Sequence, residues 1–180
     1  MNANFTIIDN STTILSELQS KIDTALEAVG LQAEAHAKNN IKQTIPREHS
    51  SSTTGHLRNS ITHIVKNDYN DNYHEVKKVI IGSNVPYAVF NEIGTGKWNS
   101  EGNGRQGWWV YVEGSSAYSP SRNVGKTYTE DEARRIMAIL RSKGLEAHMT
   151  QGMKPVHFLK RAIEENKNEY RTMIEYYLKR

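Results

Sequence analysis

The chain begins and ends with apolar residues at helical spacing, and these two segments most restrict the fold it can adopt. In the first, the stripe comprises Ile14, Leu15, Leu18, Ile22, Ala25, Leu26 and Val29. This helix is expected to kink at Gly30 and to resume through Ala33, Ala37 and Ile41. In the second, Pro155 is expected to start a helix, because a proline at the first helical position loses no hydrogen bond. Its apolar residues are Phe158, Leu159, Ala162, Ile163, Tyr170, Met173, Ile174 and Tyr177.

Between these helices the pattern indicates short antiparallel strands. Residues 60–66 and 73–82 are two runs rich in β-branched residues, and a short polar connection joins them, as in a hairpin. Residues 108–113 and 145–150 fit two more strands, residues 85–93 a short helix, and residues 46–56 a polar loop. We therefore predict an α+β fold of one domain, residues 1–180, in which the long N-terminal and C-terminal helices pack a small antiparallel sheet.

Three other segments stand outside this framework. Residues 1–10 have no clear pattern and are expected to be a mobile arm. Residues 94–107 contain five glycines, and so long a glycine-rich loop is expected to be mobile until it orders on assembly. Residues 117–150 are an insertion containing a helix near 130–143. This helix follows from the capping box at residues 129–132 and from apolar residues at Ala133, Ile136, Met137 and Leu140.

The composition excludes several classes of protein. There is no cysteine, so the chain has no disulfide and no thiolate metal site. No apolar run approaches the ~18 residues of a membrane span, and the first residues do not resemble a signal peptide, so we expect no membrane contact. The net charge of +3 is compatible with contact to a polyanion, but it lacks the clustered basic stripe of a dedicated DNA-binding protein.

No residue set has convincing spacing for catalysis or for ligand binding. Residues 102–107 satisfy G-x-G-x-x-G, but a dinucleotide site needs a strand before this motif and a helix after it. Gly94-Thr95-Gly96-Lys97 resembles a phosphate loop, yet Trp98 replaces its Ser or Thr. Of the scattered histidines, only His63 and His74 could face each other, across the predicted hairpin. We therefore expect no catalytic residue, no cofactor and no metal.

Basic and aromatic residues in and after the glycine-rich loop are the candidate subunit interface. They are Lys97, Trp98, Arg105, Trp108 and Trp109. Strand neighbours point to opposite faces, so one ring of the adjacent pair is expected in the core and the other toward solvent, the loop or a partner. Tryptophan is enriched at interface hot spots. Lys97 and Arg105 could instead face a passage for DNA and touch phosphates without reading sequence.

Three motifs, at residues 54–61 (TGHLRNSI), 85–96 (VPYAVFNEIGTG) and 152–163 (GMKPVHFLKRAI), carry a family resemblance. In this order they resemble long-tailed bacteriophage neck proteins, called tail-completion, head–tail joining or minor tail components, from about residue 25 to residue 166. The matching residues are Thr54, Gly55, Leu57, Ser60, Tyr87, Ala88, Glu92, Gly94, Gly96, Gly152, Pro155, Phe158, Leu159 and Ala162. Gly55 and Gly94 are expected to adopt backbone angles that other residues resist. Phe158 and Leu159 are expected to lock the last helix onto the sheet.

The resemblance implies a structural virion protein without catalysis. It would be one subunit of a ring homo-oligomer, a hexamer, that joins the capsid connector to the tail. Its partners would be further copies, the head connector and the tail terminator or tail tube proteins, with non-specific contact to passing DNA. It would lie in the neck of the virion, and in the host cytoplasm during assembly. The helix in residues 117–150 departs from the family pattern, as either a surface elaboration or a lineage-specific contact.

The alternative function is a small basic nucleic-acid-binding protein or a metal-dependent nuclease. The basic isoelectric point, near 9, is its best support. It predicts metal-dependent activity or salt-sensitive affinity for DNA, whereas the ring subunit predicts neither for the isolated protein.

Overall fold

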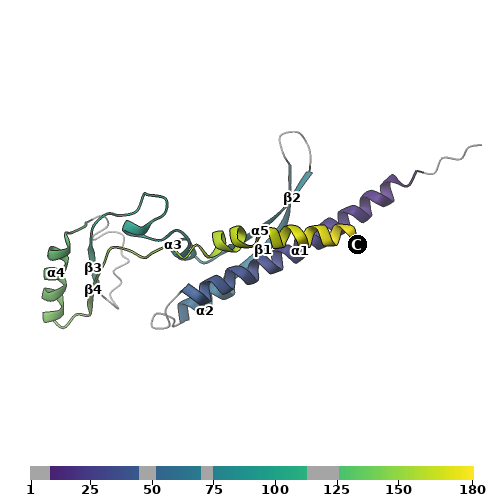
Figure 1. The fold of residues 1–180 in the computed structure, drawn as a ribbon. Coiled ribbons are helices and arrows are strands. Elements are labelled where there is room, and N and C mark those ends of the chain that lie inside the picture. Colours follow the sequence, from purple (N-terminus) through teal and green to yellow (C-terminus); the bar gives the residue numbers. More distant parts are fainter. Residues whose placement is uncertain (1–8, 45–51, 70–74, 113–125) are drawn as a thin grey trace, which may run out of the picture. The chain divides into compact units, whose positions relative to one another are not determined.

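In the computed structural model, residues 9–44, 52–69, 75–112 and 126–180 are described, and the chain forms two compact units (Figure 1). The first unit combines the residues up to Val85 with Phe158–Arg180, and the second is Pro86–His157. Residues 1–8 of the expected arm and residues 117–125 of the expected insertion lie outside the described residues. The predicted α+β class is confirmed, and its strands form two separate two-stranded sheets.

The first unit is built around helix α1 (Ser11–Thr44). Helix α5 (Phe158–Lys179) packs along it, and so does an antiparallel hairpin of β1 (Ile61–Tyr69) and β2 (Glu75–Ser83). The long helices at the two ends of the chain therefore pack against each other. A short helix, α2 (Ser52–Ser60), leads directly into β1.

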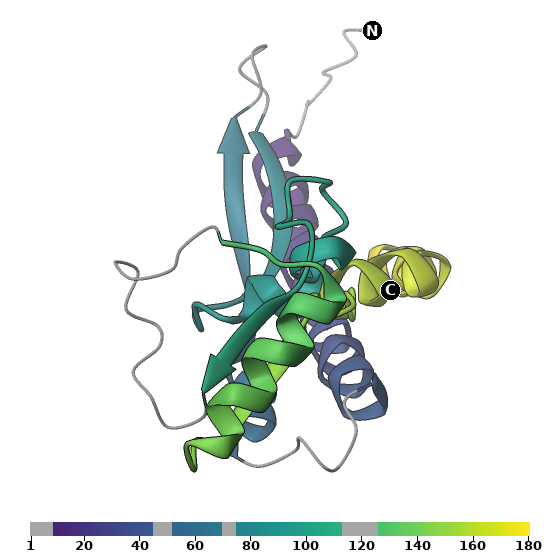
Figure 2. The same cartoon turned by 90° about the vertical axis from the view of Figure 1, so that its left-hand side faces the viewer.

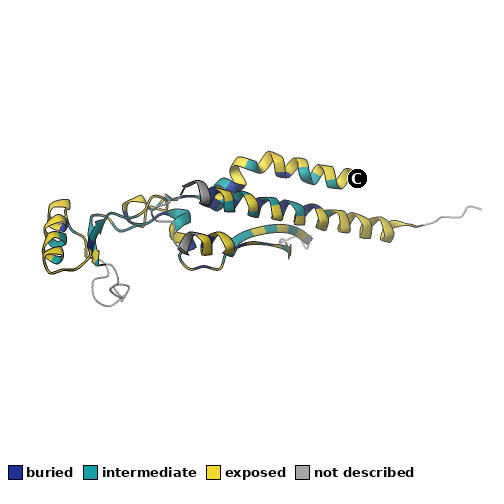
Figure 3. Ribbon diagram, turned by 90° about the horizontal axis from the view of Figure 1, so that it is seen from below, coloured by how far each residue is buried: buried dark blue, intermediate teal, exposed yellow. Residues whose placement is uncertain are grey.

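Small side chains on α1 let its neighbours approach closely. Its buried apolar residues are Ala25, Val29, Ala33, Ala37 and Ile41. The buried apolar residues of the elements around it are Leu57, Ile61, Phe158, Ala162 and Tyr170. Figure 3 shows that burial is concentrated in the central and C-terminal parts of α1, whereas its first turns are exposed. The apolar stripe of the sequence is thus only partly covered.

A chain of polar contacts crosses the packing of α1 and α5. The Tyr170 hydroxyl donates to the Ala162 carbonyl (2.7 Å) and lies 2.8 Å from Nδ1 of His36. The Gln32 side-chain amide donates to Nε2 of His36 at 3.3 Å, which leaves the His36 proton on Nδ1, facing Tyr170. Burial, aided by the charge of Glu169, raises the pKa of Tyr170 to about 12. The hydroxyl therefore stays protonated and keeps its donor role.

Gly30 does not kink α1, contrary to our prediction, because the helix runs through it without a break. A Cβ atom at this position would lie 2.1 Å from Cδ2 of His63 on β1. The ring occupies that space, with Nδ1 2.8 Å from Oε2 of Glu34 and Nε2 3.2 Å from Oε1 of Glu27. Because Gly30 has no side chain, the His63 ring can pack against α1 there and the hairpin can dock.

Gly55 also differs from the prediction. Residues 46–56 were expected to form a polar loop, but α2 begins at Ser52 and includes Gly55. Gly55 is not among the residues with positive φ, and a Cβ there would have no neighbour within 4 Å. The polar composition of residues 46–56 had suggested a loop, whereas residues 52–60 form a short helix.

We expect Gly30→Ala to destabilise the protein by about 1–3 kcal/mol, because the new methyl group collides with a ring that two carboxylates hold in place. The matched control is Gly55→Ala, which is also helical but faces open space. It should stabilise α2 by up to about 1 kcal/mol. Urea unfolding of both variants measures these effects. A stabilised Gly30→Ala would show that His63 does not dock there.

Docking of the hairpin should also depend on pH. Burial disfavours the charged His63 ring, but hydrogen bonds and charge attraction from Glu34 and Glu27 outweigh it and raise the pKa of His63. Glu34 is partly buried, yet Lys38 and His63 lower its pKa. The His63 contribution is therefore complete below its unfolded pKa of about 6.5 and is lost as pH rises through the higher folded value. The Glu34 contribution is lost as pH falls through its lowered pKa.

We therefore expect the melting temperature to fall between about pH 6.5 and pH 9 more in the natural protein than in His63→Gln, which has no proton to lose there. Thermal melts across this range measure the difference. Parallel curves for the two proteins would contradict the ion pairs at His63.

The second unit holds the glycine-rich loop and the inserted helix. It contains α3 (Ala88–Ile93), the 3-10 helix η2 (Gly96–Trp98), β3 (Trp109–Val112), α4 (Glu130–Ser142) and β4 (Ala147–Thr150). Strands β3 and β4 pair antiparallel, and α4 lies beside them (Figure 2). The predicted capping box is confirmed, with Thr129 and Glu132 exchanging hydrogen bonds. Ala133 is buried, and the other predicted apolar residues of α4 are half-buried.

Candidate assembly surface

The end of the second family motif and the start of the third lie side by side in the second unit. The Thr95 amide donates to the Met153 carbonyl (2.9 Å), and the Lys97 amide donates to the Gln151 carbonyl (3.0 Å). Further along, the Val156 amide donates to the carbonyl oxygen of Asn91 in α3 (2.7 Å). Segments more than fifty residues apart are therefore stitched together by backbone hydrogen bonds. These hydrogen bonds give a physical reason why both motifs occur in the same chain.

Glycines make this contact feasible. Gly96 (φ 58°) and Gly152 (φ 113°) both have backbone angles that favour glycine, and so does Gly94 (φ 77°), as predicted. A Cβ at Gly96 would lie 2.1 Å from the Gln151 carbonyl oxygen, and one at Gly152 would lie 2.1 Å from the Thr95 carbonyl oxygen. We had interpreted the glycines of residues 94–107 as a sign of mobility. The structure instead explains Gly94 and Gly96 by close packing of backbone on backbone.

The matching residues of the first motif lie in the first unit and those of the second motif in the second unit, whereas the third motif is divided between the two at Phe158. Leu57, Phe158 and Ala162 are buried in the first unit, and Leu159 is half-buried. In the same unit the Ser60 hydroxyl lies 2.7 Å from both the Leu57 carbonyl oxygen and the Ser83 hydroxyl. Thr54 lies in α2. Tyr87 is the N-cap of α3, Ala88 is buried, and Glu92 lies in the same helix.

Pro155 does not start the last helix, which begins at Phe158. His157 has a positive φ of 52°, and its amide donates to the Glu92 carbonyl at 3.2 Å. The residues after Pro155 are therefore bound to α3 before the helix can begin. Ile163, which we placed on the apolar face of this helix, is 50% exposed.

Four of the five predicted interface residues lie in two cation–aromatic pairs. Nζ of Lys97 lies 4.9 Å from the centroid of the Trp98 ring, and the guanidinium of Arg105 lies 5.1 Å from that of Trp109. Lys154, which sequence analysis missed, places its Nζ 4.8 Å from the same Trp98 centroid. We call Lys97, Trp98, Arg105, Trp109 and Lys154 together the cation–aromatic surface. Only the spatial contact of residues 95–97 with 151–153 reveals that Lys154 belongs to it.

The charge of this surface is not neutralised within the part of the chain that the structure describes. Lys97 donates to the side-chain oxygen of Gln151 at 3.2 Å, but neither it nor Arg105 nor Lys154 forms an ion pair there. Trp98 is 38% exposed. Stacked cations with exposed rings can bind a phosphate backbone or a carboxylate-bearing partner.

The adjacent tryptophans do not divide into one core ring and one outer ring, as we had expected. Both Trp108 and Trp109 are half-buried. Trp108 exchanges two backbone hydrogen bonds with Tyr128 (2.9 and 2.8 Å), which ties the loop to the segment before α4. Trp109 packs its ring over Gly96. The Trp108 backbone and the Trp109 ring are thus held by the second unit, and among the described residues Trp108 has no cation over its ring.

The described residues contain no group of three or more His, Asp or Glu residues that could hold a metal ion. His74 lies outside the described residues, so the predicted pairing with His63 is not addressed. None of the described helices has both the length and the apolar character needed to cross a bilayer.

One family model matches this chain. Its description is "Bacteriophage HK97-gp10, putative tail-component", and it matches residues 6–94. The matched segment contains α1, α2, the hairpin and α3, and with them the first of the three motifs and most of the second. The comparisons with curated proteins and with solved structures gave no match.

Proposed function

Residues 6–94 belong to the HK97-gp10-like family of bacteriophage tail components, and from this premise we propose that the chain is a subunit of the ring that joins the capsid connector to the tail. The family match is the observation that carries the proposal. The ring is a homo-oligomer, a hexamer, whose partners are the head connector and the tail terminator or tail tube proteins. The protein works in the neck of the virion, reaches it from the host cytoplasm, and performs no catalysis.

Two features of the structure support a role in assembly. Only part of the α1 apolar stripe is covered, and the outer face of the hairpin carries exposed aliphatic residues. A ring subunit needs such surfaces, because each copy contacts two neighbours through two different patches. The second unit adds a patch of unneutralised positive charge and exposed aromatic area.

We assign the cation–aromatic surface to contact with the DNA that passes through the ring. Lys97, Arg105 and Lys154 can bind phosphates without reading base sequence. Such contacts let DNA slide, as it must when it passes through the ring. Contact with a neighbouring subunit is the alternative for the same residues, because Trp and Arg are enriched at protein interfaces. A phosphate contact would weaken steeply as salt concentration rises, and a subunit contact through the tryptophan rings would weaken less.

The test of the joining function adds purified protein to extracts of a phage that lacks its gene. We expect the extracts alone to contain filled heads and separate tails. Added protein should restore infectious particles, with a steep dependence on concentration, because several copies must bind together. Normal tailed particles in the deletion would remove the joining function. Heads without any tails would place the protein earlier, in construction of the tail.

The same preparation tests the alternative of a metal-dependent nuclease. We expect no cleavage of single-stranded or double-stranded DNA with magnesium, manganese or zinc. Metal-dependent cleavage that is lost in His63→Gln would favour the nuclease instead.

A further inference from the structure

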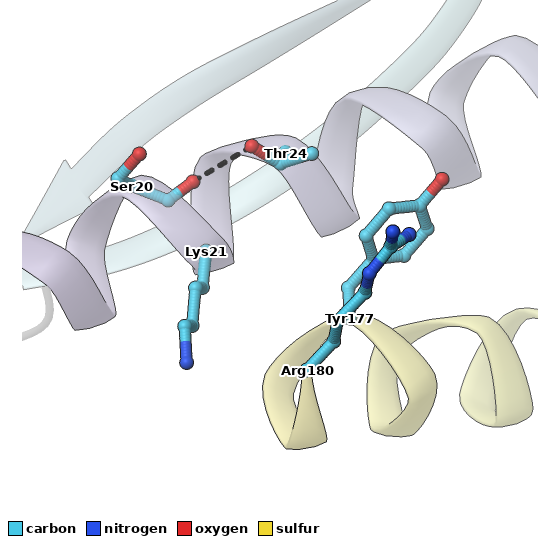
Figure 4. A pocket seen from close by; sticks show the side chains of 5 residues that line it. All are labelled: Ser20, Lys21, Thr24, Tyr177 and Arg180. Carbon is cyan, nitrogen blue, oxygen red and sulfur yellow. Dashed lines mark hydrogen bonds between the residues drawn. The ribbon is translucent and has the colours of Figure 1, made fainter.

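The first turns of α1 carry an apolar stripe that nothing in the described structure covers. Ile14, Leu15 and Leu18 are 61%, 57% and 44% exposed, and they continue the stripe that is buried from Ala25 onward. Helix α5 ends too early to cover them. Tyr177 in its last turn and Arg180, which follows it, line a pocket with Ser20, Lys21 and Thr24 of α1 (Figure 4). We call residues 11–18 the α1 overhang.

A second uncovered apolar patch lies on the hairpin. Directly paired residues of an antiparallel hairpin share a face, so Ile64 and Ile80 lie together. They are 46% and 39% exposed, and Val76 on the same face is 44% exposed. The opposite face carries His63, whose ring docks on α1. The patch of Ile64, Val76 and Ile80 is therefore the outer face of the hairpin, and it points away from α1.

The locations of the two patches determine whether they can meet within one chain or only between two copies. The overhang belongs to α1, and the outer face of the hairpin points away from α1, so one chain cannot bring its own two patches together. A second copy can. The hairpin already accepts a helix on its inner face, which shows that this pleated surface suits helix packing. Such a contact joins two different patches, and this is the arrangement that a closed ring requires.

Charge on the two patches is complementary. Glu17 lies within the overhang. Lys66 lies on the outer face of the hairpin, two residues after Ile64 and two before Asp68, the residue that pairs with Val76. Both Glu17 and Lys66 are exposed, and within the described part of the chain neither side chain forms an ion pair or hydrogen bond. On the same face Lys78 is already paired with Asp68. A carboxylate on one patch and a free ammonium on the other favour this pairing over contact between two identical patches.

We propose that the α1 overhang of one copy packs on the outer face of the β1–β2 hairpin of the next copy, with Glu17 facing Lys66 across the contact. This inference rests on the proposed ring. It names the interface that closes the ring and makes that interface head-to-tail.

Charge reversal tests the pairing. We expect E17K and K66E each to lower self-association at least tenfold, because each places like charges across every contact. An equal mixture of the two should recover it, since alternating copies restore an opposite pair at both contacts of each subunit. The double variant E17K/K66E should recover as well. The control is E164K, which makes the same change on an exposed position of α5. Sedimentation and light scattering at high protein concentration measure association, and circular dichroism checks the fold.

Cross-linking gives a second readout that does not depend on spontaneous assembly in solution. The chain has no cysteine, so a short bismaleimide can report on the variant L18C/I64C alone. In particles rebuilt with this variant we expect a ladder of covalent multimers, and none with L18C or I64C singly. Cross-links to another virion protein, or no ladder in complete particles, would overturn the interface.

The outcomes separate the interface from the joining function. Normal joining by E17K and by K66E, with no ladder, would reject the interface and leave the ring subunit intact. A charge-swap rescue of self-association, without restored infectivity of the gene-deleted extract, would keep the interface and reject the function.

Discussion

Phe158→Ala should lower the stability of the first unit by about 3–5 kcal/mol. Phe158 is fully buried and is the first residue of α5. The Asn40 side chain, itself buried, donates to the Phe158 carbonyl at 3.1 Å, so the backbone at the start of α5 is held on α1. Truncation leaves a cavity that a contact between two ordered helices cannot fill. Urea unfolding followed by circular dichroism measures the loss.

The matched control for this substitution is Ile163→Ala, five residues further along α5. Ile163 is 50% exposed, so its truncation should change stability by no more than about 1 kcal/mol. A loss from Phe158→Ala as small as that of the control would show that α5 is not anchored at its start.

Gly152→Ala should be the most damaging change in the second unit, with a cost of about 3 kcal/mol or more. A methyl group at this φ of 113° strains the backbone, and it also collides with the Thr95 carbonyl oxygen at 2.1 Å. We expect the two motifs to separate there. Hydrogen exchange of the Thr95 and Lys97 amides, which donate across the contact, should accelerate strongly.

Gly102→Ala is the control for backbone strain alone. Its φ is 74°, but a Cβ there has no neighbour within 4 Å. It should cost only about 1–2 kcal/mol and leave the Thr95 and Lys97 amides protected. Equal effects of the two substitutions would mean that the close approach of the motifs does not stabilise the unit.

Local patterns predicted the elements of this fold well. Apolar spacing predicted both end helices, alternation and β-branching predicted the hairpin, and the capping box predicted the start of α4 at its residue. These signals are local, because each depends on neighbours within one or two turns or strands. The family motifs also indicated the partnership of residues 85–96 with 152–163, although their contact itself could not be seen.

Long-range contacts account for what the sequence could not predict. From the sequence alone Gly30 suggests a kink. The structure shows that the His63 ring fills the space that a side chain at position 30 would need. The glycines at 94 and 96 suggest mobility only until the backbone of residues 151–153 is known to lie against them. Lys154 joins Trp98 for the same reason. In each case the partner lies more than thirty residues away, beyond the reach of any periodicity.

The central claim, that this tail component forms the ring between the capsid connector and the tail, is tested most directly by electron microscopy of complete virions. A reconstruction of the neck, with the protein tagged at its C-terminus, should show one ring of repeated density there. The α1 overhang of each copy should lie on the hairpin of the next. Tag density along the tail tube or at the tail tip, with none in the neck, would contradict the claim.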